Sequence, residues 1–240
     1  MISSDQIDLF SDWLMYAMQA SILIPMAVVW RQRQHFSPAV RLLSWYVYLS
    51  LTSVLLLQLY PRYLPSNYAI LVAFNMGRIA LFGAVYHHVL RGRARQVVAA
   101  ATAAALVAAL AAVAYNLSAA VTIIRVVQCA VLAGFALLYL EQRLERPAAR
   151  PNARPAARDP LWLLSVGQLL YSAGTVTAFS FTTHVGATRH DVTVKFLFVS
   201  ISGLVFNYFL TLAFLRAQAS QAVEPGAEPV AERGRQLAKL

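Results

Sequence analysis

The sequence has few charged residues, and acidic residues are the scarcest of them. Asp, Glu, Lys and Arg together make up 12% of the 240 residues, while 59% are hydrophobic; a soluble domain carries about 25% charged residues. The single cysteine, Cys129, lies inside an apolar run, which excludes a secreted disulfide scaffold. The apolar runs are about 18–25 residues long, which is the length that spans a hydrocarbon core. The composition therefore indicates a polytopic membrane protein and argues against a disordered chain.

The apolar runs bounded by charge predict an all-α bundle of seven transmembrane helices. Their predicted ranges are Ile7 to Trp30, Leu42 to Tyr60, Asn67 to Leu90, Val97 to Tyr115, Ser118 to Leu140, Leu161 to Thr183 and Val192 to Leu215. Backbone in lipid must satisfy its own hydrogen bonds, and a helix does so within one segment. The fourth range is mostly alanine, which predicts a closely packed helix. Residues 1–216 form the predicted transmembrane domain, and residues 217–240 form a flexible cytoplasmic tail.

Basic residues alternate strongly between the two ends of the predicted helices. The net charge is +10. One set of connections and the tail contains fifteen Lys and Arg residues, and the other set contains three, counting the start of the last span. The first set is Arg31, Arg33, Arg41, Arg91, Arg93, Arg95, Arg143, Arg146, Arg150, Arg154, Arg158, Arg216, Arg233, Arg235 and Lys239; the second is Arg62, Arg189 and Lys195. The positive-inside rule places the N-terminus outside and the C-terminus in the cytoplasm. These arginines face anionic lipid headgroups, so we expect the bilayer and no nucleic acid as their partner.

Two arginines lie within predicted spans, where an ionisable group is costly and therefore indicates a functional site. Arg78 lies about 16 Å along the helix from Asn67, near the midplane, and Arg125 lies about 10 Å from Ser118. No Asp or Glu occupies the centre of a span, and Asp12 is the predicted partner of Arg125. Two structural alternatives remain open: Arg78 links helices through neutral polar groups, or Arg125 extends to the outer interface.

Polar residues recur at helical spacing in five spans and predict a semi-polar cavity inside the bundle. The sets are Asp12, Tyr16 and Gln19; Ser44, Tyr48 and Thr52; Ser118, Thr122, Arg125, Gln128 and Cys129; Gln168, Tyr171, Ser172 and Thr175; and Ser200, Gly203, Asn207 and Thr211. Ordinary hydrogen bonds between helices are the alternative explanation. The predicted ligand-binding residues are Arg78, Asn75, Arg125, Gln128, Asn207 and Tyr171. The planar guanidinium of Arg78 suits a carboxylate or phosphate, such as a fatty acid or a lipid headgroup.

No arrangement of residues indicates catalysis. His87 and His88 are adjacent, so their side chains point about 100° apart on a helix and do not form a chelating pair. Neither a histidine pair at helical spacing nor a cysteine cluster is present, which argues against a metal or haem site. We therefore expect no cofactor, no metal and no enzymatic activity.

Two stretches resemble small seven-helix membrane proteins of unassigned function in Bacteroidetes-type bacteria. The first is Asp159-Pro160-Leu161-Trp162-Leu163-Leu164-Ser165-Val166-Gly167-Gln168-Leu169-Leu170-Tyr171 with Gly174, Phe179 and Asn207-Tyr208, and the second is Tyr86-His87-His88-Val89-Leu90-Arg91. The resemblance covers nearly the whole chain. It implies a multi-pass protein of the bacterial inner membrane, sometimes associated with signalling genes, and it supplies no catalytic residues.

The predicted function is a membrane sensor or receptor-like module. Its pocket would take an anionic or lipid-like ligand, and it would signal through a separate cytoplasmic or membrane partner, because the predicted helices are accompanied by no soluble domain. Two alternatives use the same architecture: a small transporter of an anionic solute, or a scaffold subunit of a membrane complex. The first three and last three spans share no motif beyond hydrophobicity, which argues mildly against a transporter built from repeats.

Overall fold

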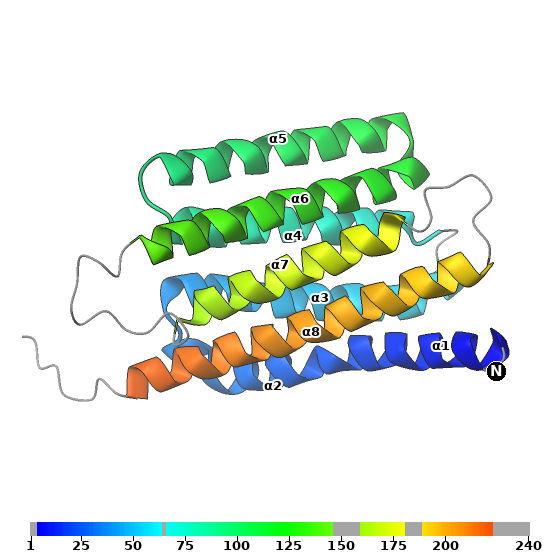
Figure 1. Cartoon of the computed structure of the whole chain (residues 1–240), viewed down its shortest axis with the longest axis horizontal. Coiled ribbons are helices and arrows are strands. Elements are labelled where there is room, and N and C mark those ends of the chain that lie inside the picture. The colour runs from blue at the N-terminus through cyan, green and yellow to red at the C-terminus, as the bar shows by residue number, and fades with distance from the viewer. Residues whose placement is uncertain (1–3, 64–65, 146–158, 181–188, 223–240) are drawn as a thin grey trace, which may run out of the picture.

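The computed structural model describes residues 4–63, 66–145, 159–180 and 189–222. Within these ranges the regular elements are all helical: α1 (Ser4–Ser21), α2 (Leu23–Gln32), η1 (Arg33–His35), α3 (Pro38–Tyr63), α4 (Tyr68–Val89), α5 (Arg93–Tyr115), α6 (Leu117–Leu144), α7 (Pro160–Ser180) and α8 (Arg189–Ala222). The long helices lie roughly side by side along one direction (Figure 1). The predicted all-α class is confirmed.

Six stretches of the described chain are long and apolar enough to cross a membrane. They are 6–35, 38–60, 68–89, 93–115, 117–144 and 192–217. Large apolar side chains cover much of the outside of the bundle; examples are Phe10, Trp13, Leu55, Leu59, Val107, Leu110, Leu137 and Tyr208. Such a surface is unfavourable in water and suits lipid. These features indicate a multi-pass membrane protein.

The helix α7 is not among these six. It has 21 residues, and its polar residues Ser165, Gln168, Ser172 and Thr175 lower its hydropathy. All four are buried, because α7 packs against both α6 and α8. The polar stripe predicted for this segment therefore faces the interior, as expected. Residues 181–183 of the predicted span lie outside the described residues.

The first predicted span consists of two helices with a break at Ile22. Pro25 lies one turn after Ser21 and has no N–H to donate to the Ser21 carbonyl, which explains the break. The last helix contacts the chain at this point: Asn207 Nδ2 donates to Ser21 Oγ at 2.7 Å and to the Met18 carbonyl at 3.4 Å. The break is thus supported by a polar contact between α1 and α8.

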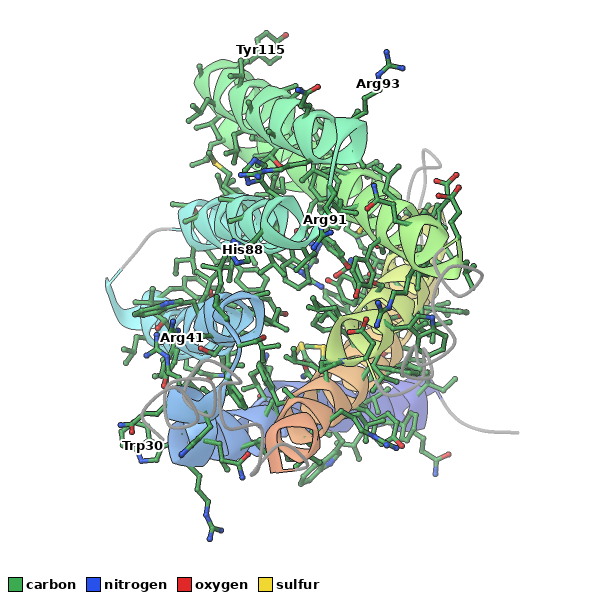
Figure 2. All side chains as sticks on the ribbon, turned by 90° about the vertical axis from the view of Figure 1, so that its left-hand side faces the viewer. Trp30, Arg41, His88, Arg91, Arg93 and Tyr115 are labelled. Atoms are coloured by element: carbon green, nitrogen blue, oxygen red, sulfur yellow. The ribbon has the colours of Figure 1, made fainter. Side chains whose placement is uncertain are left out.

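The bundle has two distinct ends. One end holds the start of α1, the ends of α3 and α7, the starts of α4 and α8 and the turn from α5 to α6, at the right of Figure 1. The opposite end carries Arg41, Arg91 and Arg93, with His88 (Figure 2). We call these the α1 end and the basic end. At the basic end Asp159 accepts from Tyr139 Oη at 2.6 Å, pairs with Arg143 Nε at 2.9 Å and caps α7.

The helix α5 lies at the periphery and packs on α4 and α6 (Figure 1). It approaches α4 closely at Gly83, where an added methyl group would meet the side chain of Thr102. Its outer face stays exposed, as Val107 and Leu110 show. The predicted close packing is therefore confined to one face.

Several helices are longer than the predicted ranges, and the C-terminal ends of α6 and α8 differ most. The helix α6 continues to Leu144 and α8 continues to Ala222, beyond the predicted ends at Leu140 and Leu215. Charged and polar residues such as Glu141, Gln142 and Arg216 ended the apolar runs in the sequence, but they do not end a helix that emerges from the membrane. The predicted tail is otherwise outside the described residues, as are residues 146–158 of the longest predicted loop.

Candidate functional site

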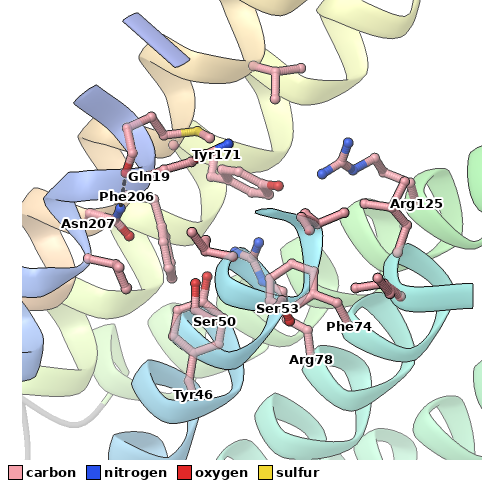
Figure 3. A pocket seen from close by; sticks show the side chains of 18 residues that line it. Gln19, Tyr46, Ser50, Ser53, Phe74, Arg78, Arg125, Tyr171, Phe206 and Asn207 are labelled. Carbon is pink, nitrogen blue, oxygen red and sulfur yellow. Dashed lines mark hydrogen bonds between the residues drawn. The ribbon is translucent and has the colours of Figure 1, made fainter. Parts of the chain in front are cut away.

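A cavity of about 140 Å³ lies inside the bundle, within its half toward the α1 end (Figure 3). Six helices and the break at Ile22 contribute to its wall. Its lining residues are Met18, Gln19, Ile22, Tyr46, Ser50, Ser53, Val54, Leu57, Ile70, Leu71, Phe74, Arg78, Arg125, Tyr171, Val199, Gly203, Phe206 and Asn207. Most of them are apolar or aromatic, and the two charged residues are both arginines. A cavity of this composition suits a ligand with an apolar body and an acidic group.

Arg78 is the most buried charge in this wall, with 1% of its surface exposed. Its Nη2 donates to Gln168 Oε1 at 2.9 Å, and Gln168 Nε2 in turn donates to Ser172 Oγ at 2.9 Å. The glutamine amide is therefore oriented by Ser172 so that its oxygen faces the guanidinium. This contact joins α4 to α7 through neutral groups and leaves the arginine charge uncompensated.

Four aromatic rings surround the guanidinium of Arg78. Its Cζ lies 4.1 Å from the ring centroid of Tyr171, 4.7 Å from Phe206, 5.2 Å from Tyr46 and 5.6 Å from Phe82. Figure 3 shows the first three of these side chains around the cavity. The negative faces of the rings stabilise a cation, each by about 0.5–2 kcal/mol. These contacts explain how the arginine is tolerated at this depth.

No carboxylate compensates Arg78 within the described ranges, and the ion pair of Arg143 with Asp159 lies at the basic end. The Nε of Arg78 has no hydrogen-bond partner, although it is buried. A buried donor left without a partner costs about 1–3 kcal/mol, and more when it is charged. Water or a bound anion is the usual explanation for such a group.

Arg125 lines the same cavity from α6 and is half-buried. Its Nε is also without a partner, and its Cζ lies 5.9 Å from the ring centroid of Phe179. The predicted pairing with Asp12 is wrong, because Asp12 is exposed on α1 and no ion pair joins the two in the described structure. The helix α1 packs on α8 and α2, not on α6.

The structure brings four of the six predicted site residues to the cavity wall: Arg78, Arg125, Tyr171 and Asn207. Of these, Asn207 also bonds to α1. The other two, Asn75 and Gln128, are buried on α4 and α6 but do not line the cavity. Both are incompletely paired: Asn75 Oδ1 and both polar atoms of the Gln128 side chain have no partner.

Sequence reasoning chose the wrong face of α3. Ser44 is buried but bonds to the Arg41 carbonyl, and Thr52 is exposed; neither lines the cavity. Tyr46, Ser50 and Ser53 line it instead. Their spacing of four and three residues is helical, so a search for polar and aromatic residues combined would have found this face. On α1, Gln19 lines the cavity as the pattern predicted, whereas Tyr16 is exposed.

Within the part of the chain that the structure describes, no group of three His, Cys, Asp or Glu side chains is arranged to hold a metal ion. His87 Nε2 accepts from Arg95 Nε at 3.1 Å, on the side of α4 that faces α5. Cys129 is a buried free thiol. The site is therefore described by its two arginines, its aromatic rings and its apolar wall.

Comparison of the chain with protein-family models, with curated proteins and with solved structures finds no match.

Proposed function

We propose that this protein binds an amphipathic anion in the cavity around Arg78 and acts as a sensor or receptor-like module of the membrane. The observation that carries the proposal is the guanidinium of Arg78, which is buried on the cavity wall without a described carboxylate and with an unpaired Nε. A carboxylate or phosphate would supply both the missing charge and the missing acceptor.

The two parts of such a ligand would contact different parts of the cavity wall. The acidic head lies between Arg78 and Arg125, and the apolar part contacts Leu57, Ile70 and Phe74. The volume of about 140 Å³ is close to that of an engineered apolar cavity of about 150 Å³ that accommodates benzene. The enclosed portion of the ligand is therefore small, and a longer chain extends out between helices.

The side between α1 and α3 is the proposed exit for a long chain. There Gln58 Nε2 donates to Gln19 Oε1 at 3.2 Å across the two helices, and this contact is exposed. A single exposed hydrogen bond is weak, so it opens readily.

The proposed membrane arrangement has seven spans, with α1 and α2 together as the first and α7 as the sixth. The N-terminus lies outside, and the basic end lies in the cytoplasm. The arginines gathered at the basic end support this orientation, and the burial of the polar face of α7 supports its place within the bundle. The cavity then opens in the outer half of the bilayer of a bacterial inner membrane.

Signalling would require a partner that contacts the basic end. The helices α7 and α8 both line the cavity and both reach the basic end. A ligand that changes their packing would therefore change the surface that a cytoplasmic or membrane partner contacts at that end. A ligand shifts the conformation only by its difference in affinity between two states.

A transporter of an anionic solute is the second candidate. The observation that favours it is the break at Ile22, which lines the cavity. Transporters place interrupted helices at their substrate sites. Flux of labelled octanoate into proteoliposomes, above the leak of protein-free vesicles, would select this candidate.

The binding proposal is tested with purified protein in nanodiscs of zwitterionic lipid and radiolabelled oleate. Arg78→Gln should weaken oleate binding by about 10- to 150-fold, which corresponds to the 1.5–3 kcal/mol of a hydrogen bond to a charged group. The matched control is Arg33→Gln, because Arg33 also stacks on aromatic rings, 4.2 Å from Trp45, but lies outside the cavity.

Two further measurements decide the outcome. Oleyl alcohol, which lacks the charge, should bind wild type and Arg78→Gln equally. Arg125→Gln, a change at a half-buried residue, provides a second variant if Arg78→Gln does not fold. Equal oleate affinity in wild type and in folded Arg78→Gln would overturn the proposal and leave Arg78 as a link between helices.

A further inference from the structure

Two cations converge on one aromatic ring between α6, α7 and α8. The Nζ of Lys195 lies 4.2 Å from the ring centroid of Phe179, and the Cζ of Arg125 lies 5.9 Å from the same centroid. One ring stabilises a cation, but two like charges at a single ring repel each other. An arrangement of this kind favours a bound anion between them.

The two acidic side chains of α1 that the structure describes are directed elsewhere, and Asp191 lies one turn before Lys195 on α8. Asp8 Oδ1 accepts from Thr193 Oγ1 at 2.7 Å, and Thr193 lies two residues before Lys195, on a different side of α8. Asp12 is exposed on α1. Within the described residues no ion pair involves Lys195 or Arg125.

Arg125 connects this cluster to the cavity. It lines the cavity together with Arg78, whereas Lys195 does not line it. Lys195 is half-buried, about 9 Å along α8 from Arg189, at the α1 end of the bundle. Arg78 lies deeper, about 15 Å along α4 from Tyr68. The three cations thus lead from the end of the bundle toward the cavity floor.

We infer that Arg125 and Lys195, which both lie near the ring of Phe179, form an outer anion site that receives a carboxylate or phosphate from water before it reaches Arg78. This inference rests on the proposed function and extends it, because it adds a residue and a route. A path lined by one sign of charge with low-dielectric walls concentrates ligands of the opposite sign and accelerates their association.

The site is tested by association kinetics, since a residue on the route affects the rate more than the final affinity. Protein in zwitterionic nanodiscs is mixed rapidly with dansyl-labelled undecanoate, whose fluorescence rises in an apolar cavity. Lys195→Gln should lower the association rate constant by roughly three- to tenfold at low salt, with a smaller change in the dissociation rate constant. Lys195→Arg should retain the wild-type rate.

Ionic strength and a remote variant serve as controls. The wild-type rate should fall as salt is raised from about 0.01 to 0.2 M, because the Debye length shortens from about 30 Å to less than 10 Å, and Lys195→Gln should respond less. Arg93→Gln, an exposed change at the basic end, should leave both the rate and its salt dependence unchanged. The primary-alcohol analogue of the probe should show neither effect.

The two proposals fail in distinguishable ways. If Lys195→Gln associates like wild type at every salt concentration while Arg78→Gln binds weakly, the outer site is overturned and the cavity proposal stands. A rate that follows the membrane concentration of the probe and not Lys195 also overturns the outer site, since the ligand then enters from the lipid. If neither variant changes binding, the cavity proposal fails as well.

Discussion

At the scale of single residues, the neutral partner of Arg78 is the decisive feature. Gln168 accepts a hydrogen bond from the guanidinium but does not neutralise it. A glutamate at the same position has the same shape and would pair with the arginine. Burial of such an ion pair is close to neutral for stability, because the loss of hydration offsets the attraction.

Gln168→Glu therefore tests the role of the arginine charge without removing it. We expect oleate affinity to fall by about 10- to 150-fold, because the new carboxylate pairs with the guanidinium of Arg78, which the carboxylate of oleate would otherwise bind. The thermal midpoint in detergent should change little. The measurement is oleate binding and thermal unfolding of the same preparations.

A second glutamine provides the matched control for this change. Gln142 lies at the basic end, where its Nε2 donates to the Arg91 carbonyl, so Gln142→Glu adds the same charge far from the cavity and should leave oleate affinity unaltered. An unchanged affinity in folded Gln168→Glu would mean that Arg78 does not contact the ligand.

At the scale of the helices, the position of α5 depends on one glycine. A Cβ built at Gly83 would lie 2.7 Å from Thr102 Cγ2, closer than such atoms approach, and 3.1 Å from Thr102 Cβ, which is a tight contact. Gly83→Ala should therefore push α5 away from α4 and destabilise the protein by about 1–3 kcal/mol, the usual cost of overpacking. Thermal unfolding in detergent measures it.

The double variant separates steric conflict from helix propensity. Thr102→Ala removes Oγ1 and Cγ2, which are the two nearest atoms, so Gly83→Ala with Thr102→Ala should recover most of the lost stability. Alanine is itself a better helix former than glycine. No recovery in the double variant would contradict a role for close packing between α4 and α5.

The helices also show why the sequence predicted the spans but not the arrangement of the helices around the cavity. Length and hydropathy are local properties, so they located the helices and the two arginines within them. Pro25 favours a break near Ile22, but the hydrogen bonds from Asn207 that support the break depend on where α8 packs, and the cavity face of α3 depends on which neighbours pack on each side. The predicted pair of Asp12 with Arg125 was wrong for the same reason: depth in the membrane is readable from the sequence, but the order of helices around the bundle is not.

At the scale of the whole molecule, the charges are separated along the bundle. The basic end carries Arg41, Arg91 and Arg93, and the half toward the α1 end holds the cavity with its two arginines and, outside the cavity, Lys195. In the proposed orientation the first group lies in the cytoplasm, because the transfer of arginines across the membrane is unfavourable. The second group requires an anion from outside if the proposed orientation holds, so the function depends on the topology.

Cysteine labelling in intact cells tests this topology on the full chain. The background is Cys129→Ala, because Cys129 is the single cysteine and is buried. A cysteine at Tyr115, which is 93% exposed between α5 and α6, should react with a membrane-impermeant maleimide added outside. A cysteine at Arg93, exposed at the other end of the same helix, should react only after the cells are opened. The two sites are joined by one helix of 23 residues, about 35 Å long, so both cannot lie on one side if α5 crosses the membrane. Labelling of position 93 from outside, with position 115 protected, would reverse the orientation and place the cavity in the cytoplasmic half.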